Sequence, residues 1–302
     1  MALSVYNVKK WSKMLMGKSI LHVNQDLGKC FKPKELKGYF NNLTEKVTKE
    51  PGLLDNDQLP VNISEDGQKV VFPVAIFQYG LGAYDLYLQS KEEKYLSKFK
   101  QCVEWAISHQ EESGAWNNFY YIYPDNPYVA MCQGEGASLL VRAYNEFNED
   151  KYINAAKKAL EFMLKPIEQG GTSLYDNDEL ILMEYTHLPA VLNGWIFALF
   201  GLYDYCLIEP NIKFQESLSQ TLATLKRKIP SYDCQYWSMY DSKGMIASPF
   251  YHNLHIAQLQ ALSMIDDRKV FQKYVFTFSK YKSSLLCRFR AFSLKAFQKM
   301  KE

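Results

Sequence analysis

The chain repeats itself with a period of about sixty residues, and this repeat limits the folds open to it. Tyr84, Tyr144 and Tyr203 are separated by 60 and 59 residues. The first two are each followed by a short polar break and a similar motif, Lys94-Tyr95-Leu96 or Lys151-Tyr152-Ile153. Each unit is therefore expected to be two helices joined by a tight polar turn.

The apolar residues within one unit have the spacing of a helix face. Leu139, Leu140, Ala143, Tyr144 and Phe147 follow an i, i+1, i+4, i+5, i+8 pattern. Helix pairs are expected at residues 73–90 and 92–112, 131–147 and 150–168, 189–206 and 211–228, and 250–264 and 267–281. Alternating β-branched segments are few and short. Repeated antiparallel pairs of this kind predict an all-α fold, an incomplete α/α toroid with one helix of each pair inside and one outside.

Length and charge divide the chain into three parts. A chain of 302 residues can bury a sizeable core without disulfides or metals. Residues 1–50 carry a net charge of +6 and residues 268–302 a net charge of +9, so the middle carries −13. We expect a basic N-terminal extension (1–70), a toroidal catalytic domain (71–281) and a basic amphipathic tail (282–302).

The tail combines cations with an apolar stripe. Five large apolar residues share one helical face among lysines and arginines: Leu285, Leu286, Phe289, Phe292 and Phe297. Such a helix suits contact with a membrane surface, and the alternative is packing against the toroid's outer helices. A homodimer is a further candidate assembly. Nucleic acid is not expected as a partner, because the sequence has no zinc knuckle, helix-turn-helix or RNA-stacking motif.

Cysteine usage and the N-terminus favour a cytoplasmic location. The six cysteines are scattered and form no C-x-x-C pair. Lys9, Lys10, Lys13 and Lys18 interrupt any apolar run near the N-terminus, which argues against a conventional signal peptide or a spanning helix. We expect a cytoplasmic protein that the tail can attach to a membrane.

Many aromatic residues lie in the long connections that lead into the inner helices. These connections, residues 116–128, 170–188 and 231–250, are expected at one rim of the toroid. Aromatic faces combined with hydroxyl groups suit sugar rings, so Trp116 and Tyr120 are candidate substrate contacts. The alternative is that the aromatic loops only close the end of the barrel.

Four residues in or beside these connections could carry proton transfer: Glu184, Tyr185, Tyr240 and Tyr251. A phenol has an ordinary pKa near 10, so as a base it must be stabilised as phenolate or act concertedly on a weak carbon acid. Two such groups on opposite faces of a ring carbon could remove one proton and return another. A single phenol beside a leaving group would give elimination, and each tyrosine could instead be only a core or rim residue.

Polar residues near the starts of the inner helices are candidate substrate-binding groups: Gln78, Tyr79, Gln133, Glu135, Asn193, His252 and His255. No metal is expected, because His252 and His255 have no third ligand at a diagnostic spacing. No cofactor is expected either, because the sequence has no Gly-rich phosphate loop and no nucleophile elbow.

Two sequence blocks are more specific than the others. The first runs from Met183-Glu184-Tyr185 through Val191-Leu192-Asn193-Gly194-Trp195 to Gly201-Leu202-Tyr203-Asp204. The second is Tyr251-His252-Asn253-Leu254-His255-Ile256-Ala257-Gln258-Leu259. Further matches are Phe72-Pro73, Gln78-Tyr79-Gly80-Leu81 and Cys132-Gln133-Gly134, and all run in order between residues 71 and 281. Together they resemble the catalytic domain of D-glucuronyl C5-epimerases.

The resemblance implies a fold, an activity and a site. It implies an α/α toroid that acts as an isomerase, inverting C5 of D-glucuronic acid in a heparosan- or heparan-like polysaccharide to give L-iduronic acid without a cofactor. The partner would be that acidic polysaccharide. The family's catalytic positions carry over onto Glu184, Tyr185, Tyr240 and Tyr251. We predict Tyr185 and either Tyr240 or Tyr251 as opposed proton carriers, with Glu184 orienting one of them.

The sequence departs from the animal enzymes in the loop between Tyr240 and Tyr251. This loop is shorter and lacks the Arg that those enzymes carry just before the Tyr-His pair, so Lys243 is its only basic residue. The identity of the polymer is therefore left open. Two alternative functions are a lyase on a uronic-acid glycan and a non-catalytic glycan-binding protein.

Overall fold

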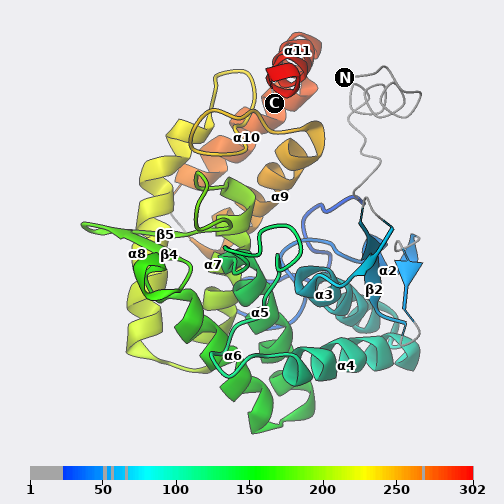
Figure 1. Cartoon of the computed structure of the whole chain (residues 1–302). Helices are drawn as coiled ribbons and strands as arrows, with labels where there is room; N and C mark the ends of the chain where they lie inside the picture. Colours follow the sequence, from blue (N-terminus) through cyan, green and yellow to red (C-terminus); the bar gives the residue numbers. More distant parts are fainter. Residues whose placement is uncertain (1–22, 50–52, 56–57, 65–66, 267–268, 302) are drawn as a thin grey trace.

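The computed structural model describes residues 23–49, 53–55, 58–64, 67–266 and 269–301 (Figure 1). Four antiparallel helix pairs follow one another: α3 (Pro73–Ser90) with α4 (Glu93–Ser108), α5 (Ala130–Phe147) with α6 (Asp150–Met163), α7 (Leu192–Ile208) with α8 (Ile212–Lys228), and α9 (Pro249–Ile265) with α10 (Val270–Ser283). A further helix, α11 (Leu285–Lys301), follows them. The expected all-α fold, an incomplete α/α toroid, is confirmed.

Local chemistry sets the helix ends. Pro73 and Pro249 occupy first helical positions, where a missing N–H costs nothing. Asn211 caps α8 by accepting two backbone N–H bonds. The largest difference from the expected bounds is at α6, which ends at Met163, five residues early. Pro166 follows closely and cannot continue a helix.

Burial separates the inner helices α3, α5, α7 and α9 from the outer helices α4, α6, α8 and α10. Thirteen of the 17 residues of α7 are buried, against four of 17 in α8. Amphipathic outer helices around nearly fully buried inner ones are what a toroid requires. The inner helices α5 and α7 touch through their backbones, because a Cβ on Gly201 would lie 2.1 Å from the carbonyl oxygen of Gly134.

The segment of residues 23–48, dark blue in Figure 1, packs against the inner helices. Phe40 stacks on Phe200 of α7, with ring centroids 3.9 Å apart. The buried ion pair between Arg142 and Asp204 lies beneath the segment, and Arg142 donates two hydrogen bonds of 3.0 Å to its backbone carbonyls. These residues of the expected N-terminal extension therefore share the toroid's core.

Short elements complete the described chain. These are the helix α2 (Glu45–Thr48), the antiparallel sheet of β1 (Leu53–Leu54), β2 (Pro60–Ile63) and β3 (Lys69–Val70), the hairpin of β4 (Ser173–Asp176) and β5 (Glu179–Leu182), and the 3-10 turns η1 (Ile167–Gln169) and η2 (Ile229–Tyr232). In the hairpin, Ser173 pairs with Leu182. The hairpin occupies the connection into α7 and sets where Glu184 emerges. Within the described chain, every helix is too short or too polar to span a bilayer.

Candidate active site

Three tyrosines from two connections and one helix meet around one glutamate. Glu184 and Tyr185 follow β5, Tyr240 lies in the loop before α9, and Tyr251 is in the first turn of α9. The rings of Tyr240 and Tyr251 lie 4.9 Å apart, and the side chain of Tyr240 is close enough to those of Tyr185 and Tyr251 to affect the pKa of each. Each tyrosine is half-buried. The structure thus brings together all four residues proposed for proton transfer.

Backbone pairing holds the two connections side by side. The N–H of Leu192, at the start of α7, donates to the carbonyl of Tyr240 at 3.1 Å, and Val191 bridges to Asp241. The N–H of Ser242 donates to the carbonyl of Ala190 at 3.0 Å. Residues 190–192 and 240–242 therefore form one two-stranded wall, which fixes Tyr240 relative to the segment that carries Tyr185.

Glu184 is buried against the backbone of α7. A Cβ on Gly194 would lie 2.1 Å from the Glu184 carboxylate oxygen Oε2, so only glycine leaves room for the carboxylate there. Burial raises the pKa of Glu184 to about 7, although hydrogen bonding from Tyr185 and from the backbone N–H of Gly194 opposes this rise. A carboxyl with such a pKa exchanges protons readily near neutral pH.

The three phenols are weaker acids than free tyrosine. Burial, followed by the charge of Glu184, raises the pKa of Tyr185 and of Tyr240 well above the usual value. The same two causes raise the pKa of Tyr251 to about 12. All three therefore hold their protons at neutral pH and can donate hydrogen bonds to a developing negative charge.

One aromatic connection forms a wall beside this cluster. Phe119 stacks on Tyr185 at 5.3 Å, and Tyr123 meets Tyr185 edge-on at 5.8 Å. The two residues proposed from this connection as sugar contacts lie elsewhere. Trp116 is fully buried and its indole N–H donates to Ala106, whereas Tyr120 is exposed to solvent.

A second polar group lies inside the toroid. Gln78 Nε2 donates to both carboxylate oxygens of Glu135, at 2.9 and 3.0 Å, and both side chains are buried. Burial raises the pKa of Glu135 to about 8. The charge of Lys46 opposes this rise and that of Glu184 adds to it, so Glu135 lies within electrostatic range of both.

Lys46 is a residue that the motifs did not indicate. It belongs to α2, which packs on α3 where a Cβ on Gly82 would meet the backbone of Leu43. Its side chain is partly exposed, yet surrounding protein desolvates the ammonium and lowers its pKa. No described residue places a carboxylate within ion-pair distance of it. The ammonium is therefore desolvated and lies within electrostatic range of Glu135.

The two histidines of α9 are held within the protein. His252 Nδ1 accepts the N–H of Ser238 at 3.1 Å, and its Nε2 donates to the carbonyl of Phe278 at 3.0 Å. His255 Nδ1 lies 2.9 Å from the Ser238 hydroxyl. Burial lowers the pKa of both to about 3, so both are neutral. They position the loop that carries Tyr240 on α9, and the described residues contain no group of ligands suited to a metal.

The remaining candidates divide between structural positions and the site. Gln133 clamps the start of the aromatic connection by bonding the N–H and the carbonyl of Trp116, both at 3.0 Å. Tyr79 faces the outer helix α4, where Lys98 lies over its ring. Asn193 lies beside Gly194 in the first turn of α7, and its buried side-chain oxygen has no partner among the described residues.

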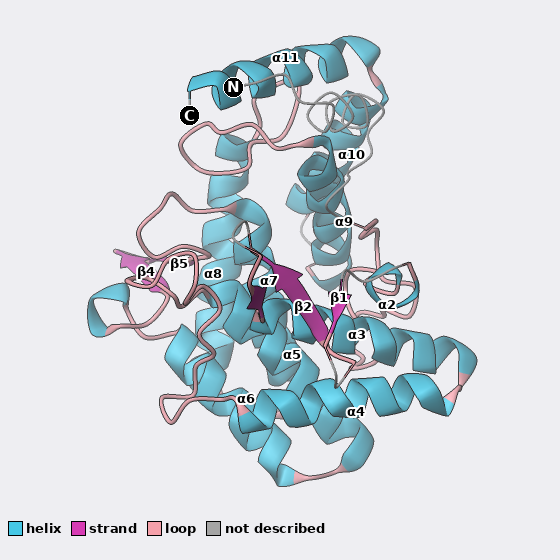
Figure 2. Cartoon of the chain, turned by 45° about the vertical axis from the view of Figure 1, so that its right-hand side comes forward, coloured by secondary structure: helices cyan, strands magenta, loops and turns pink. Residues whose placement is uncertain are grey.

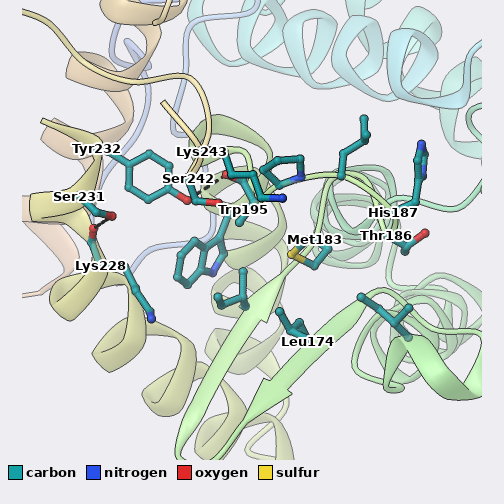
Figure 3. A pocket seen from close by; sticks show the side chains of 15 residues that line it. Leu174, Met183, Thr186, His187, Trp195, Lys228, Ser231, Tyr232, Ser242 and Lys243 are labelled. Atoms are coloured by element: carbon teal, nitrogen blue, oxygen red, sulfur yellow. Dashed lines mark hydrogen bonds between the residues drawn. The ribbon is translucent and has the colours of Figure 1, made fainter. Parts of the chain in front are cut away.

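A cavity of about 450 Å³ opens on the outer side of the two-stranded wall (Figure 3). Met183 and Thr186, which flank Glu184 and Tyr185, contribute to its lining, together with Ser242 and Lys243 from the neighbouring segment. The three clustered tyrosines do not line it. The cavity is therefore separate from the cluster of Glu184, Tyr185, Tyr240 and Tyr251, which we call the acid–phenol cluster.

The fold places the chain among the α/α-toroid proteins. Cellobiose 2-epimerase from Bacillus thermoamylovorans superposes with a TM-score of 0.58 at 10% identity, over 92% of this chain and 87% of that one. A family 76 α-mannanase from Bacteroides thetaiotaomicron gives 0.53 at 12% identity, over 80% and 73%. These likenesses concern the fold alone.

Sequence comparison identifies the family. The family model described as D-glucuronyl C5-epimerase C-terminus matches residues 110–280, more than half of the chain, and the chain belongs to this family. The D-glucuronyl C5-epimerase of Caenorhabditis elegans is 27% identical over 215 residues, covering 62% of this chain and 35% of that protein. An uncharacterised protein of Methanocaldococcus jannaschii is 29% identical over 151 residues, covering 48% and 49%. The chain thus spans half or less of these relatives.

Proposed function

We propose that this protein is a uronosyl C5-epimerase that converts D-glucuronic acid to L-iduronic acid residues within an acidic, heparosan-like polysaccharide. The observation that carries the proposal is the convergence of Tyr185, Tyr240 and Tyr251 on the buried Glu184. The resemblance to the family carries its catalytic positions onto these four residues, and family membership supports the same reaction class.

The reaction removes and replaces one proton. The C5–H bond breaks, its electron pair moves toward the adjacent carboxylate, and a tyrosine oxygen on one face takes the proton. A proton delivered from a tyrosine on the opposite face then re-forms the C–H bond with inverted configuration. No electrons are gained or lost overall, so the step needs no oxidant or reductant.

Glu184 supplies what the phenols lack. A phenol that holds its proton at neutral pH must pass it to an acceptor before it can act as a base. Glu184 has a pKa of about 7 and lies close enough to Tyr185 for each to affect the pKa of the other, so it can take that proton as Tyr185 receives the one from C5. Tyr240 and Tyr251 both begin protonated. One gives its proton to C5 from the opposite face and regains a proton from the protonated Glu184, and the other donates a hydrogen bond to the developing charge.

The substrate carboxylate also needs a positive partner. Lys243 lines the outer cavity, away from the tyrosines. Lys46 instead faces the inner polar group, within range of Glu135. We assign Lys46 as the cation that holds the uronate carboxylate, a role that would compensate for the missing arginine in the loop before Tyr251.

Hydrogen exchange at C5 tests the proposal. Glucuronate-containing glycans incubated with the protein in deuterated water should gain deuterium at C5, and iduronate should appear by NMR. Absence of exchange across heparosan and related uronans would refute an epimerase. Growth of ultraviolet absorbance from an unsaturated uronide would identify a lyase instead. Binding without either signal would identify a non-catalytic glycan-binding protein.

A further inference from the structure

One face of helix α11 packs on the protein and the other faces solvent. One face packs on the loop that carries Tyr240: Ala291 is buried in a small apolar cluster with Trp237 and Ile246. Lys295 Nζ donates to the carbonyl of Ile246 at 2.9 Å, and Gln298 bonds both the N–H of Ile246 and the carbonyl of Gly244, at 3.0 and 2.8 Å. This face of α11 braces residues 237–246.

The other face of α11 carries large apolar side chains that are exposed to solvent. Leu285 and Leu286 are 77% and 78% exposed, Phe289 is 66% exposed and Phe297 is 49% exposed. Leu286, Phe289 and Phe297 recur at helical spacing, so they lie along one stripe opposite Ala291. Exposed apolar side chains of this size gathered on one helix mark a contact surface rather than a random surface composition.

The charge around this stripe selects the partner. Residues 269–301 contain nine lysines and arginines and no aspartate or glutamate. Lys282, in the last turn of α10, and Arg290, on α11, are both exposed, and the guanidinium of Arg290 lies over the ring of Tyr236 in the loop that α11 braces. A second copy of the same face would bring like charges together, which disfavours a homodimer through α11. A nucleic acid would use the cations but has no need of four exposed leucines and phenylalanines.

We propose that α11 docks on an anionic lipid membrane, with Leu285, Leu286, Phe289 and Phe297 in the interface and the surrounding cations against lipid headgroups. A basic helix with a large apolar face lies in the membrane interface in this way. Figures 1 and 2 both place α11 at the end of the molecule opposite the α4 and α6 helices. Docking would therefore hold the α11 end of the toroid, and the Tyr240 loop that α11 braces, next to the bilayer.

Vesicle sedimentation of the full chain tests this directly, without any substrate. The protein should pellet with phosphatidylcholine vesicles that contain phosphatidylserine, should not pellet with phosphatidylcholine alone, and should be released by high salt. The Leu285→Ser/Leu286→Ser/Phe289→Ser variant should bind anionic vesicles at least about tenfold more weakly. Ile212→Ser is the matched control, because Ile212 is equally exposed at 73% but begins α8.

A second pair of variants tests the charges without touching the apolar face. Lys280 and Lys282 are both exposed in the last turn of α10, directly before α11. Lys280→Gln and Lys282→Gln should each weaken binding to anionic vesicles by about fivefold. Unchanged thermal melting of every variant would show that the fold is intact. Unaltered vesicle binding by the triple variant would overturn the proposal. Self-association that the triple variant abolishes, without any vesicle binding, would overturn it in favour of a second copy. Because catalysis is not measured, failure here leaves the epimerase proposal standing, and the reverse also holds.

Discussion

Gly194 makes the position of Glu184 testable with a single methyl group. In Gly194→Ala the new Cβ would lie 2.1 Å from Glu184 Oε2, whereas an ordinary contact requires at least 3.4 Å, so the carboxylate must retreat by about 1 Å. Misplacement of a catalytic group by about 1 Å costs on the order of 100-fold in rate. We expect C5 deuterium exchange in Gly194→Ala to fall by about that factor.

The stability change in the same variant should be smaller than the loss of rate. Overpacking at a buried site costs about 1–3 kcal/mol, and alanine regains about 1 kcal/mol of helix propensity over glycine. The net loss of about 0–2 kcal/mol corresponds to a fall in Tm of a few degrees at most. Calorimetry or circular dichroism would measure it.

The double variant Glu184→Ala/Gly194→Ala is the control. Removing the carboxylate removes the clash, so the double variant should melt at or above the temperature of Glu184→Ala, with a coupling energy that favours the pair. Activity should stay low in both. A wild-type rate of C5 exchange in Gly194→Ala would refute the idea that packing on α7 positions Glu184 for catalysis. Simple additivity of the stability changes of Glu184→Ala and Gly194→Ala would refute it as well.

Three further predictions concern the same site. Tyr185→Phe should reduce C5 exchange by about 100-fold or more at nearly unchanged Tm, whereas Tyr84→Phe, which loses a hydroxyl bond to Glu146, should lower stability by about 1 kcal/mol and leave exchange intact. Burial raises the folded-state pKa of Glu184 to about 7, so the stability that comes from its protonated carboxyl is complete below the unfolded pKa and is lost as pH rises through 7. Tm should therefore fall over this pH range, and Glu184→Gln should flatten the slope of Tm against pH. A steeper slope in that variant would contradict the assigned shift. Lys46→Met should raise KM for a glucuronate glycan by about tenfold, with a smaller change in kcat and partial rescue by Lys46→Arg. An equal loss of binding affinity for a carboxyl-reduced glycan, which cannot react, would show that Lys46 does not bind the carboxylate.

The helical scaffold could be predicted from the sequence because the helix signals lie within each repeat. Helix-face spacing indicates α3 and α9, and Pro249 marks the start of α9, without reference to distant residues. Pro189, the other proline expected near a helix start, lies three residues before α7, which begins at Leu192. The bounds failed where a non-periodic feature intervened. Pro166 ended α6 early, and the β4–β5 hairpin formed inside a connection expected to be irregular. Both depend on short signals that a search for helical periodicity overlooks.

The acid–phenol cluster was also accessible, since its residues lie next to helix starts at one rim. The binding candidates were less predictable, because helix position does not specify which way a side chain points. Gln78 and Tyr79 are neighbours on α3, yet one bonds Glu135 inside and the other packs beneath Lys98 outside. From the sequence, His252 is a plausible substrate-binding residue. Only the structure shows that both of its ring nitrogens are already hydrogen-bonded, one to Ser238 and the other to Phe278.

Lys46 illustrates why an incomplete toroid changes where site residues come from. Four helix pairs leave the inner face of α3, α5 and α7 open, and residues 23–48 fill that space instead of further helices. A cation on this segment reaches the inner polar group from a direction that no helix repeat supplies. If the segment carries the carboxylate partner, then Lys46 takes the place of the arginine that the loop before Tyr251 lacks. Phe250→Arg should then partly restore the KM of Lys46→Met. Failure of that rescue at unchanged Tm would show that an arginine before Tyr251 does not replace Lys46.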